Sequence, residues 1–194
     1  MSIINMALED IDELRSVISN ISPDDCETFE QEVFRAKRIF VVAAGRSLLA
    51  MKFFAMRLMQ IGFTTYIVGD VCTPSIQAGD LLIVGSGSGE TPSILRITQK
   101  AKSIGARVAV MTKNDKSAIA MLADSSVQLN TRTRIREGSA TSKGQNDADY
   151  CSIRPSGNPF EQSIVIFSDA VICSLMCKLG RGTDYIAANH ANLE

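Results

Sequence analysis

A short run of small polar residues, placed between an apolar segment and a proline, is the part of this sequence best suited to chemistry. Residues 85–91 read GSGSGET, follow the apolar run 81–84 and directly precede Pro92. Thr91 as an N-cap and Pro92 at the first helical position predict a helix that begins here. Helix N-termini bind anions through their N–H groups and positive dipole end. Because glycine leaves those N–H groups uncovered, residues 85–91 are predicted to bind a phosphate group.

This segment differs from the two familiar glycine-rich nucleotide loops. No lysine follows the glycines at the spacing of a P-loop. In the dinucleotide fingerprint the third glycine would replace Glu90, and an acid would end the next strand, where Met111 stands. The hydroxyls of Ser86, Ser88 and Thr91 suit a phosphate monoester that must bind reversibly. The alternative is a tight turn with an ordinary helix cap. Glu90 is expected to point away from the phosphate or to contact substrate hydroxyls.

A second candidate site follows the first predicted strand. Residues 45–47 read Gly-Arg-Ser and separate the apolar run 38–43 from a predicted helix at 47–60. In an open parallel sheet, ligands bind in a crevice at the carboxyl ends of the strands. Residues 45–47 and 85–91 are therefore predicted to face the same crevice. Arg46 can bind phosphate or sugar oxygens bidentately, and the alternative is a solvated arginine that the helix dipole mildly disfavours.

Two titratable residues near the C-terminus are further candidates, but residue types alone assign neither of them a role. Glu161 stands in the first turn of a predicted helix at 159–179. A glutamate in that position complements the helix dipole without any functional reason. His190 is the only histidine and lies in the closing stretch, where a histidine is ordinarily just exposed.

Hydrophobic periodicity predicts the elements that must position these residues. Strands and helices alternate, which is typical of an α/β fold with a parallel sheet of five strands and helices on both faces. The helix at 47–60 is apolar on more than one face, so it is expected in the core or in a subunit contact. Residues 130–157 lack periodicity and are expected to be a functional or disordered loop, part of which orders against a neighbouring subunit. The predicted strands are 38–43, 63–68, 81–84, 108–111 and 125–129, and the helices are 3–20, 25–37, 47–60, 92–104, 117–122, 159–179 and 183–189.

Composition limits the classes of function. A chain of 194 residues suits one domain, 1–194. Its net charge of -1 lacks the basic surplus of a nucleic-acid binder, so an acidic substrate must be held locally. The five cysteines form no CxxC pair, and Cys173 and Cys177 are expected to be small buried residues, with a metal pair as the alternative. No leader and no apolar stretch long enough to cross a bilayer is evident, so a cytoplasmic protein is expected.

Three segments of the chain resemble the 6-phospho-3-hexuloisomerases of the sugar isomerase (SIS) family. They are AAGRSLLAMKFFAMRLMQIGF at 43–63, GDLLIVGSGSGETPSI at 79–94, and the tail SIRPSGNPFEQSIVIFSDAV at 152–171 followed by HANLE at 190–194. SIS proteins of many functions share the glycine-serine loop. The FEQS and HANLE pieces are more specific to the hexuloisomerases.

The resemblance implies an SIS-type three-layer αβα sandwich and an isomerase that interconverts D-arabino-hex-3-ulose 6-phosphate and D-fructose 6-phosphate. This reaction belongs to the ribulose monophosphate pathway of formaldehyde fixation, where a hexulose-phosphate synthase supplies the substrate. The resemblance further implies a homotetramer without metal or organic cofactor. By matching positions, Ser86, Ser88 and Thr91 hold the phosphate, with Arg46 and Ser47 beside them. Glu161 matches the candidate catalytic glutamate, and His190 matches a tail histidine that enters a neighbour's active site.

Two other functions are compatible with the same loop. One is an SIS module that senses a sugar phosphate without chemistry, although regulators of this kind usually carry a helix-turn-helix domain for which residues 1–37 are too short. The other is an isomerase similar to those that act on arabinose 5-phosphate, which often carry further domains downstream.

Overall fold

The structure, a computed structural model, describes residues 2–131 and 158–193. The predicted loop at 130–157 lies almost entirely outside the described residues. In chain order the elements are α1 (Ile3–Ser19), α2 (Pro23–Phe34), β1 (Ile39–Ala43), α3 (Gly45–Gln60), β2 (Thr65–Ile67), β3 (Leu81–Gly85), α4 (Pro92–Ile104), β4 (Arg107–Thr112), the short 3-10 helix η1 (Ala120–Leu122), β5 (Ser125–Gln128), α5 (Asn158–Leu179) and α6 (Thr183–Ala188).

The five strands form one parallel sheet, as the alternation of strands and helices predicts. Their order across the sheet is β2-β1-β3-β4-β5. Every residue of β1 and β3 is buried. Strands that are covered on both faces in this way read as continuous apolar runs of β-branched residues, which is why sequence pattern alone located them.

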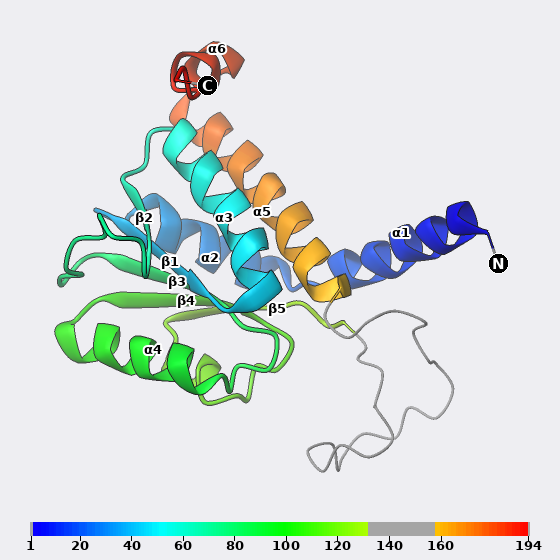
Figure 1. Cartoon of the computed structure of the whole chain (residues 1–194), viewed down its shortest axis with the longest axis horizontal. Helices are drawn as coiled ribbons and strands as arrows, with labels where there is room; N and C mark the ends of the chain where they lie inside the picture. Colours follow the sequence, from blue (N-terminus) through cyan, green and yellow to red (C-terminus); the bar gives the residue numbers. More distant parts are fainter. Residues whose placement is uncertain (1, 132–157, 194) are drawn as a thin grey trace.

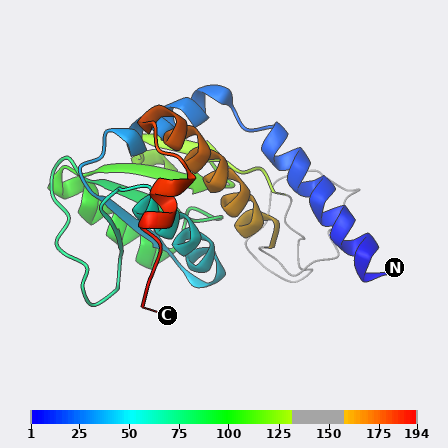
Figure 2. The same ribbon diagram turned by 90° about the horizontal axis from the view of Figure 1, so that it is seen from above.

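Helices cover both faces of the sheet and make three layers (Figure 1). On one face, Phe29 of α2, Phe54 of α3 and Phe167 of α5 pack with the sheet in a single apolar cluster. On the other face, α4 and η1 pack against a second cluster that includes Phe40 and Ile94. The predicted three-layer αβα sandwich is therefore confirmed. Figure 2 shows α1 reaching away from these layers beyond α5.

The strand order places a topological switch point between β1 and β3. The chain leaves β1 through α3 on one face of the sheet and leaves β3 through α4 on the other. β1 and β3 are hydrogen-bonded neighbours, and their last residues, Ala43 and Gly85, are paired. The two following connections diverge to opposite faces of the sheet. Parallel sheets bind ligands at such a switch point, so the carboxyl ends of β1 and β3 are the candidate crevice.

Some local predictions are wrong. Residues 45–47 are not a loop before the helix but the first turn of α3. Cys173 and Cys177 are exposed, because they lie on the side of α5 that faces away from the core. The expectation that no apolar stretch could cross a bilayer fails for α5, since Pro159–Leu179 is long and apolar enough by length and composition. One side of this helix packs in the core through Phe160, Ile164, Phe167, Val171, Ile172 and Leu175.

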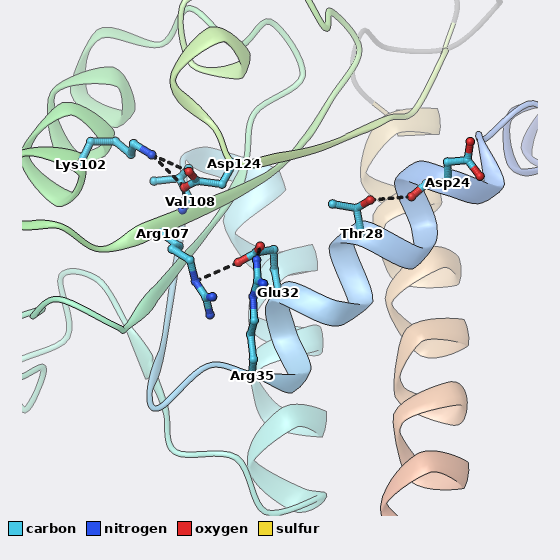
Figure 3. Close-up of polar contacts among 8 residues, drawn as sticks. All are labelled: Asp24, Thr28, Glu32, Arg35, Lys102, Arg107, Val108 and Asp124. Atoms are coloured by element: carbon cyan, nitrogen blue, oxygen red, sulfur yellow. Dashed lines mark hydrogen bonds and ion pairs between the residues drawn. The ribbon is translucent and has the colours of Figure 1, made fainter.

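A buried carboxylate ties α2 to the start of β4, at the opposite end of the sheet from the crevice. The Glu32 side chain is 2% exposed, and its Oε2 lies 2.9 Å from Nε of Arg107. Arg35, the C-cap residue of α2, pairs with the same carboxylate (Figure 3). A separate ion pair in Figure 3 joins Lys102 to Asp124 at 2.8 Å, and Asp124 also accepts the N–H of Val108. The first cluster therefore ties α2 to β4, and the second ties α4 to β4 through Asp124.

We expect Arg107→Gln to destabilise the protein, because it leaves the buried Glu32 carboxylate with Arg35 as its remaining cation. Breaking a buried ion pair costs about 3–5 kcal/mol, and the remaining arginine reduces the expected loss to about 2 kcal/mol. Urea unfolding followed by circular dichroism measures it. The matched control is Arg96→Gln on α4, an exposed arginine. Equal stability of the two variants would contradict a stabilising role for the Glu32 cluster.

Candidate active site

The loop at 85–91 leaves part of its backbone open at the start of α4. Thr91 is the N-cap of this helix and Pro92 its first residue, as the sequence predicts. The N–H groups of Gly87, Ser88 and Thr91 donate to no other group among the residues that the structure describes. Open N–H groups at a helix N-terminus attract an anion. The geometry therefore suits the phosphate site that the sequence predicts.

The serine hydroxyls of this loop help to shape it and can still bind a ligand. Ser86 is buried, and its Oγ accepts the N–H of Gly89 at 3.2 Å. The Oγ of Ser88 accepts the N–H of Glu90 at 3.2 Å. A hydroxyl that accepts a hydrogen bond keeps its own hydrogen to donate. Thr91 makes no capping bond with its side chain, so all three predicted hydroxyls have a hydrogen for phosphate oxygens.

Gly89 and Glu90 stabilise the conformation of the loop in different ways. Gly89 has φ +64°, and a Cβ there would lie 1.9 Å from Oγ of Ser117. A side chain at this position would be both strained and blocked. Glu90 turns its carboxylate to the following segment, where Oε1 accepts the N–H of Ala118 at 2.7 Å. Glu90 therefore braces the loop from outside, which agrees with the expectation that it points away from the phosphate.

Glu161 lies in the first turn of α5, next to Phe160, whose ring would lie 3.3 Å from a Cβ on Gly87 of this loop. Its neighbour Phe160 is buried in the core, which fixes the helix start, and Glu161 itself is 8% exposed. Ser47 donates its hydroxyl to Oε1 of Glu161 at 3.0 Å. The Nε of Arg46 lies 3.7 Å from Oε2, and the Arg46 side chain is 60% exposed. Ser47, expected beside the phosphate, thus holds the carboxylate, while Arg46 can still reach a ligand.

Lys113 lies at the same edge of the sheet, although no sequence motif marks it. It directly follows β4, is half-buried, and donates its backbone N–H to the carbonyl oxygen of Gly87 at 3.1 Å. Burial lowers the pKa of Lys113, and the charge of Glu161 acts against that shift. One signal was available in the sequence, because residues directly after a parallel strand lie where ligands bind.

The structure does not bring His190 to this site. His190 follows α6, which lies beyond the end of α5 remote from the crevice (Figure 1). The 22 residues of α5 span about 30 Å, and Glu161 is at its other end. His190 is exposed, and its Nδ1 lies 3.2 Å from the carbonyl oxygen of Ala191. Within one chain, Glu161 and His190 cannot act on the same small substrate.

The groups at the crevice suit acid–base chemistry on a phosphorylated substrate. A buried carboxylate, held by a hydroxyl, lies near the candidate anion loop and close enough to Lys113 for its charge to act on the ammonium group. A carboxylate is an effective base for a proton next to a carbonyl. Among residues 2–131 and 158–193, no group of three or more His, Cys, Asp or Glu side chains is placed to hold a metal ion.

Comparisons with known proteins assign the chain to a family. A model of the SIS domain matches residues 32–145. The chain belongs to the SIS family. This match covers β1 and the loop at 85–91 but ends before α5, so Glu161 lies outside it. The sequence resemblance to SIS proteins is thereby confirmed.

Individual relatives of this SIS protein match nearly its whole length. The 3-hexulose-6-phosphate isomerase of Bacillus subtilis is 39% identical over 96% of both chains. The enzyme of the same name from Methylomonas aminofaciens is 40% identical over 95% of this chain and 96% of its own. A solved structure from Methanococcus jannaschii, whose description infers a 3-hexulose-6-phosphate isomerase function, has a TM-score of 0.78 and 29% identity, with 98% of each chain covered. This name is a synonym of 6-phospho-3-hexuloisomerase, the branch that the sequence motifs indicate.

Proposed function

We propose that this protein is a 3-hexulose-6-phosphate isomerase, which interconverts D-arabino-hex-3-ulose 6-phosphate and D-fructose 6-phosphate. The observation that carries the proposal is the buried carboxylate of Glu161, held by Ser47 near the candidate anion loop. Two relatives that bear this enzyme name are 39% and 40% identical to this protein, in alignments that cover nearly the whole chain. The pathway is the ribulose monophosphate route of formaldehyde fixation, to which the reaction belongs.

The reaction moves a ketone from C3 to C2 without net redox change. A base removes the proton from C2, the C2–C3 bond gains double-bond character, and a proton is then added to C3. The hydroxyl on C2 loses its hydrogen as the oxygen on C3 gains one, so an enediol is the intermediate. Glu161 is proposed to move the carbon-bound proton, and such general acid–base help is worth about 10²–10⁴-fold.

The phosphate of the sugar is proposed to bind at 85–91. Ser86, Ser88 and Thr91 donate their hydroxyls to its oxygens, together with the open N–H groups of the loop. Arg46, whose side chain is largely exposed beside Glu161, contacts the phosphate or the sugar hydroxyls. This remote binding energy positions C2 and C3 next to the carboxylate.

A homotetramer is proposed because two helices expose apolar faces. On α3 the exposed side chains are Leu49, Phe53, Met56 and Met59, and on α1 they are Ile3, Ile4, Leu8 and Ile11. Soluble monomers rarely expose contiguous apolar patches of large size. Helix α3, which the sequence predicts for the core or a subunit contact, packs one face in the core and exposes the other, which is proposed to contact a neighbouring subunit. In such an assembly His190 enters a neighbour's crevice and is proposed to open the sugar ring or protonate the carbonyl oxygen.

Mixing two inactive variants tests the shared site. We expect Glu161→Gln and His190→Ala each to be nearly inactive alone, and to recover activity when they are co-expressed, because some crevices then combine Glu161 from one chain with His190 from another. Random tetramers recover at most about a quarter of the wild-type activity if each site needs one residue from each of two chains. Light scattering on the purified mixture measures the assembly. A monomeric protein, or a mixture without activity, would contradict His190 acting between chains.

The remaining assignments complete the proposal. Residues 1–194 form a single SIS domain in a cytoplasmic enzyme. Its functional partner is a hexulose-phosphate synthase, which makes the substrate from formaldehyde and ribulose 5-phosphate. No nucleic acid, membrane, metal or organic cofactor is part of the proposed reaction.

A coupled assay tests the function directly. The protein is supplied with formaldehyde, ribulose 5-phosphate and a hexulose-phosphate synthase, and fructose 6-phosphate is measured with and without it. Formation of fructose 6-phosphate that depends on the protein is the expected result. Binding of sugar phosphates without turnover would instead identify a sensing module, and turnover of arabinose 5-phosphate alone would identify the other kind of isomerase.

A further inference from the structure

Lys113 is anchored at the crevice by both neighbouring strands. Its backbone N–H donates to the carbonyl oxygen of Gly87, in the loop after β3, at 3.1 Å. Its own carbonyl oxygen accepts Nε2 of Gln128, the last residue of β5, at 3.2 Å. Because both the N–H and the carbonyl of Lys113 are hydrogen-bonded, the backbone at this residue is fixed relative to the sheet. Functional side chains are held in place by support of this kind.

The Lys113 side chain lies against the loop at 85–91, beside the start of α5. A Cβ on Gly87 would stand 3.1 Å from Cε of Lys113 and 3.3 Å from the ring of Phe160, so Gly87 provides room for the lysine stem. Phe160 directly precedes Glu161 on α5. The lysine stem and the Phe160 ring therefore both lie against Gly87, and the charge of Glu161 acts on the ammonium group.

We propose that the ammonium group of Lys113 binds the sugar oxygen on which negative charge develops when Glu161 removes the carbon-bound proton. This inference rests on the proposed isomerase function and adds a catalytic residue to it. Deprotonation next to a ketone places negative charge on the carbonyl oxygen. A fixed positive group in a partly buried site stabilises that charge far better than water does. Lys113 keeps its proton during the step and stabilises the enediolate oxygen by a hydrogen bond.

The surroundings of Lys113 suit this task. Burial lowers its pKa, which makes the ammonium a stronger hydrogen-bond donor than an exposed lysine, while the Glu161 carboxylate favours the charged form. Arg46 of α3 pairs with the same carboxylate at 3.7 Å. Because the pKa is below 10.5, the ordinary value for lysine, activity that needs the ammonium should decline with rising pH earlier than an exposed lysine would titrate.

Substitution of Lys113 separates a role at the reacting oxygen from a role at the phosphate. We expect Lys113→Met to lower kcat for fructose 6-phosphate about 10²-fold or more, while KM and inhibition by inorganic phosphate change less than about threefold, as for an interaction made in the transition state alone. Lys113→Arg keeps the positive charge, so its kcat should be at least about tenfold higher than that of Lys113→Met. In Lys113→Arg the alkaline decline of kcat should shift to higher pH than in the wild type, because arginine does not titrate in that range.

Controls make each result decisive. Lys116→Met removes an exposed lysine three residues away and should leave kcat unchanged. Full activity of Lys113→Met, or weakened phosphate inhibition with an unchanged kcat, would overturn the proposal, the latter by making Lys113 a phosphate ligand. If Lys113→Met fails to fold, an alkaline decline that is the same in wild type and Lys113→Arg overturns it as well. A wild-type protein without isomerase activity would instead refute the proposed function.

Discussion

Glu161→Gln should lower kcat about 10²–10⁴-fold, the usual worth of general acid–base catalysis, while fructose 6-phosphate still binds. The amide has nearly the same shape as the carboxylate and can keep the hydrogen bond from Ser47, but it cannot accept the carbon-bound proton. The partners that hold Glu161 are Ser47 and Arg46 of α3, so the loop at 85–91 that is proposed to bind the phosphate should be undisturbed. Initial rates measure kcat, and isothermal calorimetry measures the affinity, which should change less than about threefold because binding and chemistry are separate.

The matched control is Asp169→Asn, an exposed carboxylate on the same helix α5. It removes one negative charge from α5 at a distance from the crevice and should retain wild-type rates. Activity of Glu161→Gln within tenfold of wild type would remove Glu161 from the role of proton carrier. Loss of binding together with loss of rate would show instead that the carboxylate holds the sugar.

Gly89→Ala should lower the stability of the protein more than the other substitutions proposed for it. It should also abolish phosphate binding. A non-glycine residue at φ +64° costs about 1–2 kcal/mol. The added Cβ would meet Oγ of Ser117 at 1.9 Å, and relieving such a contact costs about 1–3 kcal/mol more. The free energy of unfolding should therefore fall by about 3 kcal/mol. Urea unfolding measures this loss, and inhibition by inorganic phosphate reports on the distorted loop.

Gly180→Ala separates the two causes, because Gly180 has φ +63° with no atom within 4 Å of a Cβ. This control should lose only the 1–2 kcal/mol of backbone strain and should bind phosphate normally. Equal stability of the two alanine variants would mean that Ser117 moves aside freely. Normal phosphate inhibition in Gly89→Ala would mean that the loop conformation is not what binds the anion.

Local sequence signals predicted the loop at 85–91 and its helix closely. The helix was expected at 92–104 with Gly105 as its cap, and α4 spans Pro92–Ile104 with Gly105 at φ +91°. These features depend on interactions within a few residues, such as the proline ring at the first helical position and the freedom of glycine. Apolar runs located β1, β3 and β4 in the same way, because a strand covered on both faces needs apolar side chains at nearly every position.

Contacts between distant segments could not be predicted in this way. The bond from Ser47 to Glu161 joins residues 114 apart, and no local pattern indicates that these two side chains meet. Lys113 was missed because it belongs to no motif. Cys173 and Cys177 of α5 were predicted to be buried but are exposed. In a mostly apolar helix, the sequence pattern does not indicate which side another helix will cover.

The amino-acid order by itself determined most elements, the glycine-serine loop at 85–91 and the family to which the chain belongs. Each of these depends on neighbouring residues or on a recognisable motif. Only the tertiary structure decided the strand order, the switch point between β1 and β3, and the meeting of Ser47, Glu161 and Lys113 beside it. It also placed His190 at the remote end of α5. The physical reason is that these arrangements follow from packing two helical layers on one sheet, and the free energy of that packing is shared among residues far apart in the chain.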